Sequence, residues 1–168
     1  MVPWAWGMAC FMLMYSFGTS FAQTTPTDVQ KFKSQADALE DQSAQAIDDG
    51  NIHLGLELMG RSVNLDPAPA RRMNYGGMLY GDGIEIFENI DQHQGLVILQ
   101  KAESQLRLAI AAFNPDQDQI YLSQCYFILG KIYMDAYTDP AKAKEYFKRA
   151  IDFSNYTGAE SALNRLSQ

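Results

Sequence analysis

The residue types that most often carry out catalysis are few in this 168-residue chain, and none stands in a recognisable catalytic pattern. His53 and His93 are the two histidines, and no Ser or Cys nucleophile in a known motif accompanies either of them. A catalytic triad needs such a nucleophile beside its base. We therefore interpret both histidines as surface or half-buried side chains.

The cysteine, glycine and carboxylate patterns also favour structural roles. Cys125 has no basic neighbour in the sequence that would lower the pKa of its thiol, so we expect a buried structural thiol. Gly81-Asp82-Gly83 is too short to cradle a phosphate, and no Lys follows it. No Cys/His cluster has metal-ligand spacing, and the carboxylates lack EF-hand spacing. The sequence thus predicts a protein without catalytic residues, metal or cofactor.

Composition narrows the classes of partner. The chain is 47% hydrophobic and 20% charged, which suits one globular domain with a hydrophobic core. Its net charge is −7, and it has no basic stripe. An acidic chain of this kind is not expected to bind nucleic acid or an anionic lipid surface.

The stretch from Ser123 to Ile151 has the clearest periodicity. Tyr126, Leu129, Gly130 and Tyr133 recur at spacings of three and four, and so share one face of a helix. A glycine inside a helix costs about 1 kcal/mol relative to alanine. We therefore expect a neighbouring helix to pass close to Gly130.

A second helix follows, with Asp139 as its N-cap and Pro140 in its first turn. Its lysines and Arg149 are expected to face water. The apolar face of this helix contains five side chains: Ala143, Tyr146, Phe147, Ala150 and Ile151.

The pattern Leu-Gly-x-x-Tyr, then Asp, then Lys-Ala-x-x-Tyr-Phe-x-x-Ala resembles the tetratricopeptide repeat. An unrelated antiparallel helical hairpin is the alternative. The resemblance implies an all-α fold of antiparallel helical hairpins, stacked as a short right-handed solenoid with a C-terminal capping helix. Weaker copies place repeats at about 36–68, 69–116 and 117–153, with the cap at 154–168. Thr27 is the expected N-cap of the first helix.

The second repeat is expected to be enlarged. The spacing from Leu79 to Ala102 exceeds that from Tyr133 to Ala143 by 13 residues, inserted around 81–95. Two prolonged helices are favoured over an elaborated loop, because long structureless loops are uncommon in compact domains. The apolar residues of the insertion would then pack on a helix that begins near Asp116, with Gln119 in a capping box.

Residues 1–22 contain no charged side chain and are interpreted as a secretory signal peptide that is cleaved after Ala22. The mature domain would then be 23–168, and the protein periplasmic or secreted. The signal lacks a basic side chain near its start, so an uncleaved signal that anchors the chain to the inner membrane is the alternative.

The resemblance implies that the first helix of each repeat lines a concave groove in which a partner's segment docks. Residues carried over as partner-binding are Met73, Asn74, Tyr80, Phe127, Lys131 and Met134, and further groove positions are Asp37, Glu40, Asp41, Ala44, Gly77 and Gln124. Some of them could instead fill the core. Family members that clamp a peptide's terminal carboxylate use Lys, Arg and Asn. With only Asn74 and Lys131 and an acidic first repeat, this chain suits a helix or an apolar-plus-basic segment instead.

These features together favour a non-catalytic adaptor or assembly factor of the bacterial cell envelope, with another envelope protein or peptide segment as its partner. The alternative is an accessory small-ligand-binding protein of a periplasmic uptake system, with a pocket in the enlarged hairpin that includes Asn74 and Tyr80. Membrane contact is expected only through an uncleaved signal. Homo-oligomerisation through the inserted segment stays open.

Overall fold

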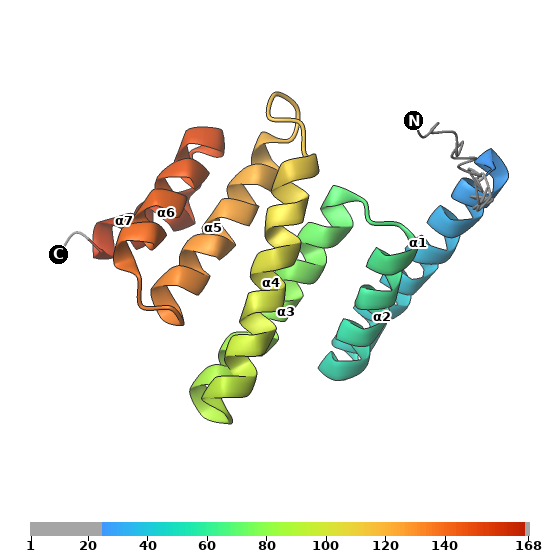
Figure 1. Ribbon diagram of the computed structural model, residues 1–168, viewed down its shortest axis with the longest axis horizontal. Coiled ribbons are helices and arrows are strands. Elements are labelled where there is room, and N and C mark those ends of the chain that lie inside the picture. Colours follow the sequence, from blue (N-terminus) through green and yellow to red (C-terminus); the bar gives the residue numbers. More distant parts are fainter. Residues whose placement is uncertain (1–24, 167–168) are drawn as a thin grey trace, which may run out of the picture.

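The computed structural model describes residues 25–166, which form seven α-helices and no strand. Three antiparallel hairpins stack side by side and a last helix follows them (Figure 1). The all-α, solenoid-like fold is thereby confirmed, whereas the predicted signal peptide lies outside the described residues. The helices are α1 (Pro26–Asp48), α2 (Ile52–Leu65), α3 (Pro69–Asn89), α4 (Gln92–Ala112), α5 (Gln119–Asp135), α6 (Pro140–Ser154) and α7 (Thr157–Arg165).

Two helix starts differ from the sequence prediction. Thr25, and not Thr27, is the N-cap of α1, because it forms a reciprocal capping box with Asp28 and leaves Pro26 in the first turn. Helix α5 begins at Gln119 rather than near Asp116. The Asp118 carboxylate accepts a hydrogen bond from the backbone N–H of Asn114 at 2.9 Å, so it closes the preceding loop instead of capping the helix.

Small side chains allow the two helices of a hairpin to approach closely. The hydroxyl of Ser62 on α2 donates to the carbonyl of Ala36 on α1 at 2.7 Å, and Ser123 on α5 donates to Ala150 on α6 at 2.7 Å. A Cβ atom added at Gly130 would lie 2.5 Å from the ring of Phe147. The close approach that was predicted at Gly130 is therefore confirmed.

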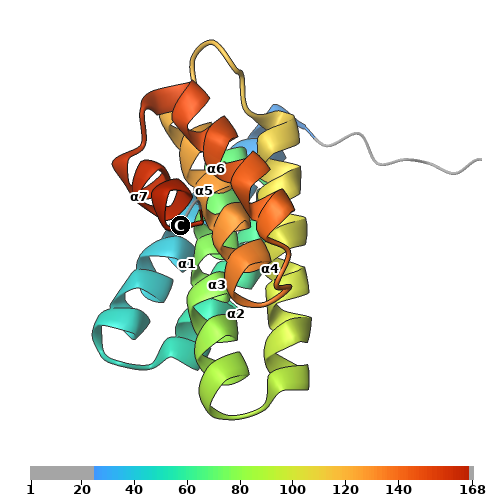
Figure 2. The same ribbon diagram turned by 90° about the vertical axis from the view of Figure 1, so that its left-hand side faces the viewer.

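The enlarged second hairpin consists of two prolonged helices of 21 residues each, as expected. Its tip extends beyond the turns of the neighbouring hairpins (Figures 1 and 2). The helices pack mainly on each other there, since Gly95 lies against the backbone of Phe87. The expectation that the start of α5 covers this tip is wrong. Tyr121 in the first turn of α5 stacks on Phe113 at the opposite end of the hairpin, and Ile90 at the tip is 73% exposed.

Helix α7 closes the C-terminal end of the stack. Ala159 and Ala162 are fully buried, Leu163 is half-buried, and Glu160 and Arg165 are exposed. This is the arrangement expected of a capping helix with a polar outer face. Over residues 25–166, no helix combines the length and the apolar character that a membrane crossing requires.

Candidate partner-binding face

We call the surface of the first helices of the three hairpins the first-helix face (α1, α3 and α5). Helix α3 packs on α5, and side-chain hydrogen bonds join it to α1. Asn74 on α3 donates its side-chain amide to the Glu40 carboxylate on α1 at 3.1 Å. On the other side of α3, Tyr80 donates its hydroxyl to Asp135 at the end of α5 at 3.2 Å. Polar bridges therefore join α3 to both of its neighbours on this face.

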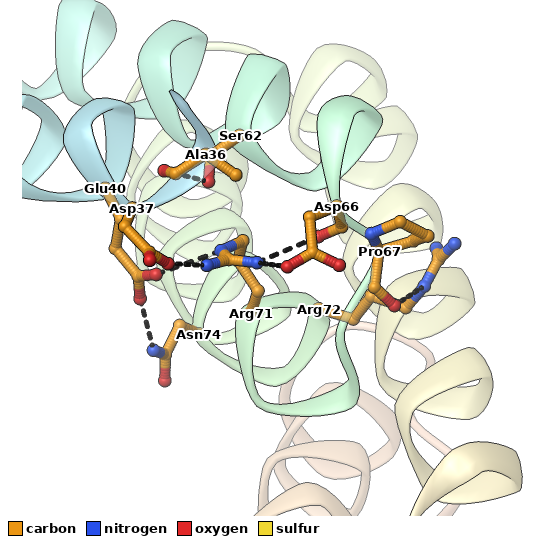
Figure 3. Close-up of polar contacts among 9 residues, drawn as sticks. All are labelled: Ala36, Asp37, Glu40, Ser62, Asp66, Pro67, Arg71, Arg72 and Asn74. Carbon is orange, nitrogen blue, oxygen red and sulfur yellow. Dashed lines mark hydrogen bonds and ion pairs between the residues drawn. The ribbon is translucent and has the colours of Figure 1, made fainter. Parts of the chain in front are cut away.

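A buried arginine links the first and second hairpins. Arg71 is 6% exposed, and its guanidinium bonds to the carboxylates of Asp37 and Glu40 on α1 and of Asp66 in the α2–α3 connection (Figure 3). Burial alone would lower the pKa of Arg71, but the hydrogen bonds that it donates to Asp66 and Glu40 prevail and raise its pKa. The arginine stays charged and ties three segments together.

The carboxylates of this cluster outnumber its cation three to one. Asp37 is 54% exposed, and Glu40 and Asp66 are about one-third exposed, so their charges reach solvent although Arg71 itself is hidden. Asp41, one residue further along α1, is exposed as well. The α1–α3 end of the first-helix face is therefore acidic.

An open cavity of about 330 Å³ lies beside this acidic cluster. Ala44 and Ile47 of α1 and Asn74 and Met78 of α3 line it, with Glu40 at its edge. The cavity combines an apolar lining with a carboxylate and an amide. It can accept an apolar side chain while the neighbouring acids attract a cation.

The α3–α5 end of the face carries charges of both signs, and Glu88 on α3 acts on Tyr80 there. Lys131 forms an ion pair with Asp135 at 2.7 Å, four residues further along α5. Asp135 also accepts the Tyr80 hydroxyl, and burial together with the Asp135 charge raises the pKa of Tyr80. Lys131 is thus already paired, and a partner's carboxylate would have to compete with Asp135 for it.

The structure distributes the six predicted partner-binding residues over different environments. Asn74 is exposed beside the cavity, and Tyr80 and Lys131 meet at Asp135. Met73 is 8% exposed and belongs to the core, so it offers little surface to a partner. Met134 is half-buried against the core.

Phe127, the remaining predicted residue, packs on the C-terminal end of the molecule. Its ring centroid lies 4.9 Å from that of Tyr156 and 5.9 Å from that of Phe147. A Cβ atom at Gly158 of α7 would also contact it at 3.4 Å. Phe127 therefore contributes to the seating of α7, and a substitution there would disturb that packing.

Sequence reasoning missed Arg71, Met78 and Asp135. Asp135 follows Lys131 by four residues on a helix, a spacing that signals an ion pair. Arg71 gave no such signal, because its three partners come from other segments, up to 34 residues away in the chain. A cation in the first turn of a helix also interacts unfavourably with the helix dipole, so there was no reason to expect an arginine at this position to be stabilising.

The structure also places the histidines and the cysteine that the sequence singled out. His53 and His93 are exposed. Cys125 is fully buried, and burial raises the pKa of its thiol to about 12. Within residues 25–166 no three His, Cys, Asp or Glu side chains gather in a way that could hold a metal ion.

Comparison with known proteins identifies the fold. No protein-family model and no curated protein sequence matches the chain significantly. A solved structure, described as the first TPR of Spaghetti (RPAP3) bound to HSP90 peptide SRMEEVD, superposes with a TM-score of 0.60 over 81% of this chain and 93% of that one. The fold is a tetratricopeptide-repeat fold. Sequence identity between the two is 19%, so the TPR likeness concerns the fold alone.

Proposed function

We propose that this protein is a non-catalytic adaptor that binds a basic, partly apolar segment of another protein on its first-helix face. The observation that carries the proposal is the acidic cluster of Asp37, Glu40 and Asp66 beside the apolar cavity at Ala44. A segment with an apolar side chain flanked by Lys or Arg matches both features. TPR solenoids offer extended concave surfaces for such segments, which supports the choice of this face.

The charges on this face do not suit the peptide that is bound in the structural neighbour. The peptide SRMEEVD carries three carboxylate side chains. In the present chain, Arg71 is buried among three carboxylates and Lys131 is paired with Asp135. Like charges placed opposite each other disfavour a complex. We therefore expect weak binding of SRMEEVD and preferential binding of basic segments.

The cellular setting is proposed from the N-terminal sequence. Residues 1–22 lack charged side chains, which supports export to the bacterial cell envelope and a partner there. The partner is an envelope protein or a peptide segment of one, and the protein would act in its positioning or assembly. Nothing in this proposal requires that the signal is cleaved.

Selection of peptides from a displayed random library, followed by titration of the selected peptides, tests the binding chemistry. Selected peptides should carry Lys or Arg next to a large apolar residue, and charge-reversed versions should lose binding. Ala44→Arg places a long cation in the cavity and should weaken binding at least tenfold. Ala141→Arg on α6 is the matched control, because it adds the same side chain at an exposed helical position away from this face.

Two results would count against the proposal. Selection of predominantly acidic peptides would show that the acidic cluster does not set specificity. Equal weakening by Ala44→Arg and Ala141→Arg, with both variants folded by circular dichroism, would place the site elsewhere on the molecule.

A further inference from the structure

A second cavity lies between the second helices of the last two hairpins, away from the first-helix face. It opens between α4 and α6 over α5 and has a volume of about 560 Å³. Leu129 of α5 and Ile110 and Ala111 of α4 provide apolar lining, and Tyr126 and Tyr146 contribute aromatic rings. We call this cavity the α4–α6 cleft. Its size falls within the range of small-molecule sites, about 300–1,000 Å³.

Arg107 on α4 is held rigidly at one edge of the cleft. Its guanidinium donates to the Glu103 carboxylate at 2.7 Å and to the Tyr146 hydroxyl on α6 at 2.7 Å. Tyr133 and Tyr137 of the α5 region donate to the same carboxylate at 2.8 and 3.1 Å. Among the described residues, the Nη1 amino group of Arg107 has no acceptor. This pre-positioned donor can serve a ligand.

Two further cations border the cleft from α6. Lys142 lies with its ammonium 4.8 Å from the centre of the Tyr133 ring, and it pairs with no carboxylate in the described part of the chain. The guanidinium of Arg149 lies 5.6 Å from the centre of the Tyr126 ring and pairs with Glu145 at 3.1 Å. Cation–π contacts orient both side chains over the tyrosines without neutralising their charge.

The lining of the cleft is positive on a molecule that is strongly negative. Three cations, Arg107, Lys142 and Arg149, line it with one carboxylate, Glu145, whereas the whole chain carries −7. The carboxylates of Glu103 and Asp139 do not line the cleft but act on Arg107 and Lys142 from nearby. Lys142 also donates to the Tyr133 hydroxyl at 3.5 Å, and its remaining donors and the Nη1 group of Arg107 stay available to a ligand. Concentrated positive charge in a cleft attracts anions selectively.

We propose that the α4–α6 cleft binds a small organic anion. Lys142 and the Nη1 group of Arg107 hold one oxyanion group, a carboxylate or a phosphate, and the apolar body of the ligand lies on Leu129 and Ile110. Arginine suits such planar oxyanions because its donors are arranged in a fixed fork. This site is separate from the first-helix face, so it would let a metabolite bind while a protein segment is held on the other face.

Amide NMR titration tests the proposal with three small probes: benzoate, phenyl phosphate and neutral benzamide. We expect benzoate or phenyl phosphate to bind with a Kd of about 1 mM or tighter and to shift the signals of residues around Leu129. Benzamide should cause no comparable shifts. The first two probes distinguish a carboxylate ligand from a phosphate ligand.

Variants on α6 place the binding in the cleft. Lys142→Gln should weaken binding at least tenfold, and Arg149→Gln should weaken it as well; both side chains are exposed, so the fold should persist. Lys148→Gln is the matched control, because it removes the same charge from α6 at an exposed position that does not line the cleft.

Three results would overturn the proposal. The first is that neither anion binds at millimolar concentration. The second is that Lys142→Gln and Lys148→Gln weaken anion binding equally. The third is that the amide signals that shift belong only to α1 and α3. The first two results do not bear on peptide binding at the first-helix face, so the two proposals can fail independently. Shifts confined to α1 and α3 would also count against the preference of that face for basic segments.

Discussion

Three helical glycines make the packing of the hairpins measurable. Gly81 of α3 is exposed, and an added Cβ would meet no atom within 4 Å. At Gly130 the same atom would lie 2.5 Å from the Phe147 ring, and at Gly95 it would lie 2.5 Å from the backbone of Phe87. Substitution of each glycine by alanine adds the same methyl group to a helix in three different surroundings.

The expected magnitudes follow from two opposing effects. Alanine favours a helix over glycine by about 1 kcal/mol at each position. Gly81→Ala should therefore stabilise the protein by about that amount. Gly130→Ala gains the same helical contribution but pushes on Phe147, which is fully buried and cannot move away freely. Overpacking of this kind costs about 1–3 kcal/mol, and that is the predicted difference between the two variants.

Gly95→Ala should be the most destabilising of the three. Its methyl group would press on the Phe87 backbone, which yields less readily than a side chain. From most to least stable, the expected order is therefore Gly81→Ala, wild type, Gly130→Ala and Gly95→Ala.

Urea denaturation followed by circular dichroism measures these free energies of unfolding. The Gly81→Ala variant is the internal control, because it gains the helix propensity of alanine and its added methyl group meets no neighbouring atom. If Gly130→Ala and Gly81→Ala differed by less than about 0.5 kcal/mol, the size of an ordinary surface effect, the close approach of α5 and α6 would be refuted.

Three further predictions concern charged and titratable groups. Arg71→Met should lower the free energy of unfolding by about 2–3 kcal/mol in urea denaturation, because it leaves three carboxylates without their cation. These carboxylates are partly exposed, so the loss should be smaller than for a fully buried ion pair. Burial alone would raise the pKa of Glu103, but hydrogen bonds from Arg107 and two tyrosines lower it below its ordinary 4.5. The ionised carboxylate thus stabilises the fold above pH 4.5, and this contribution disappears as pH falls through the lowered native pKa, so Glu103→Gln should flatten the acid side of a stability–pH profile. In a Cys10→Ser background, Cys125 should resist a thiol reagent at pH 8 in the folded protein and react rapidly in urea, as measured by absorbance, because its thiol is fully buried.

The sequence predicted the fold well because its signals were local. The Leu-Gly-x-x-Tyr pattern placed a close contact at Gly130, and the 13 additional residues of the second repeat kept helical spacing, which predicted two prolonged helices. The N-cap was predicted at Thr27 and not at Thr25 because both threonines precede a helical segment. Only the capping box with Asp28 distinguishes Thr25 as the N-cap.

The surroundings of the candidate site residues were harder to predict, because they depend on contacts between distant segments. The spacing that placed Met73 on the first-helix face also fits a buried position, and packing against the core decided the outcome. Arg71 bridges residues 31 and 34 positions away in the chain, which no periodicity encodes. The α4–α6 cleft is likewise lined by residues of three helices, and the residues of each helix alone resemble an ordinary amphipathic face.

The most direct test of the proposed docking on the first-helix face is site-specific photo-crosslinking in the cells that produce the protein. A photoreactive amino acid replaces Ala44 in one variant and Ala141 in the other, and crosslinked partners are identified by mass spectrometry. The proposed function predicts one envelope protein crosslinked from position 44 through a segment rich in Lys or Arg, and little crosslinking from position 141. Equal crosslinking at both positions, or crosslinking through an acidic segment, would contradict it.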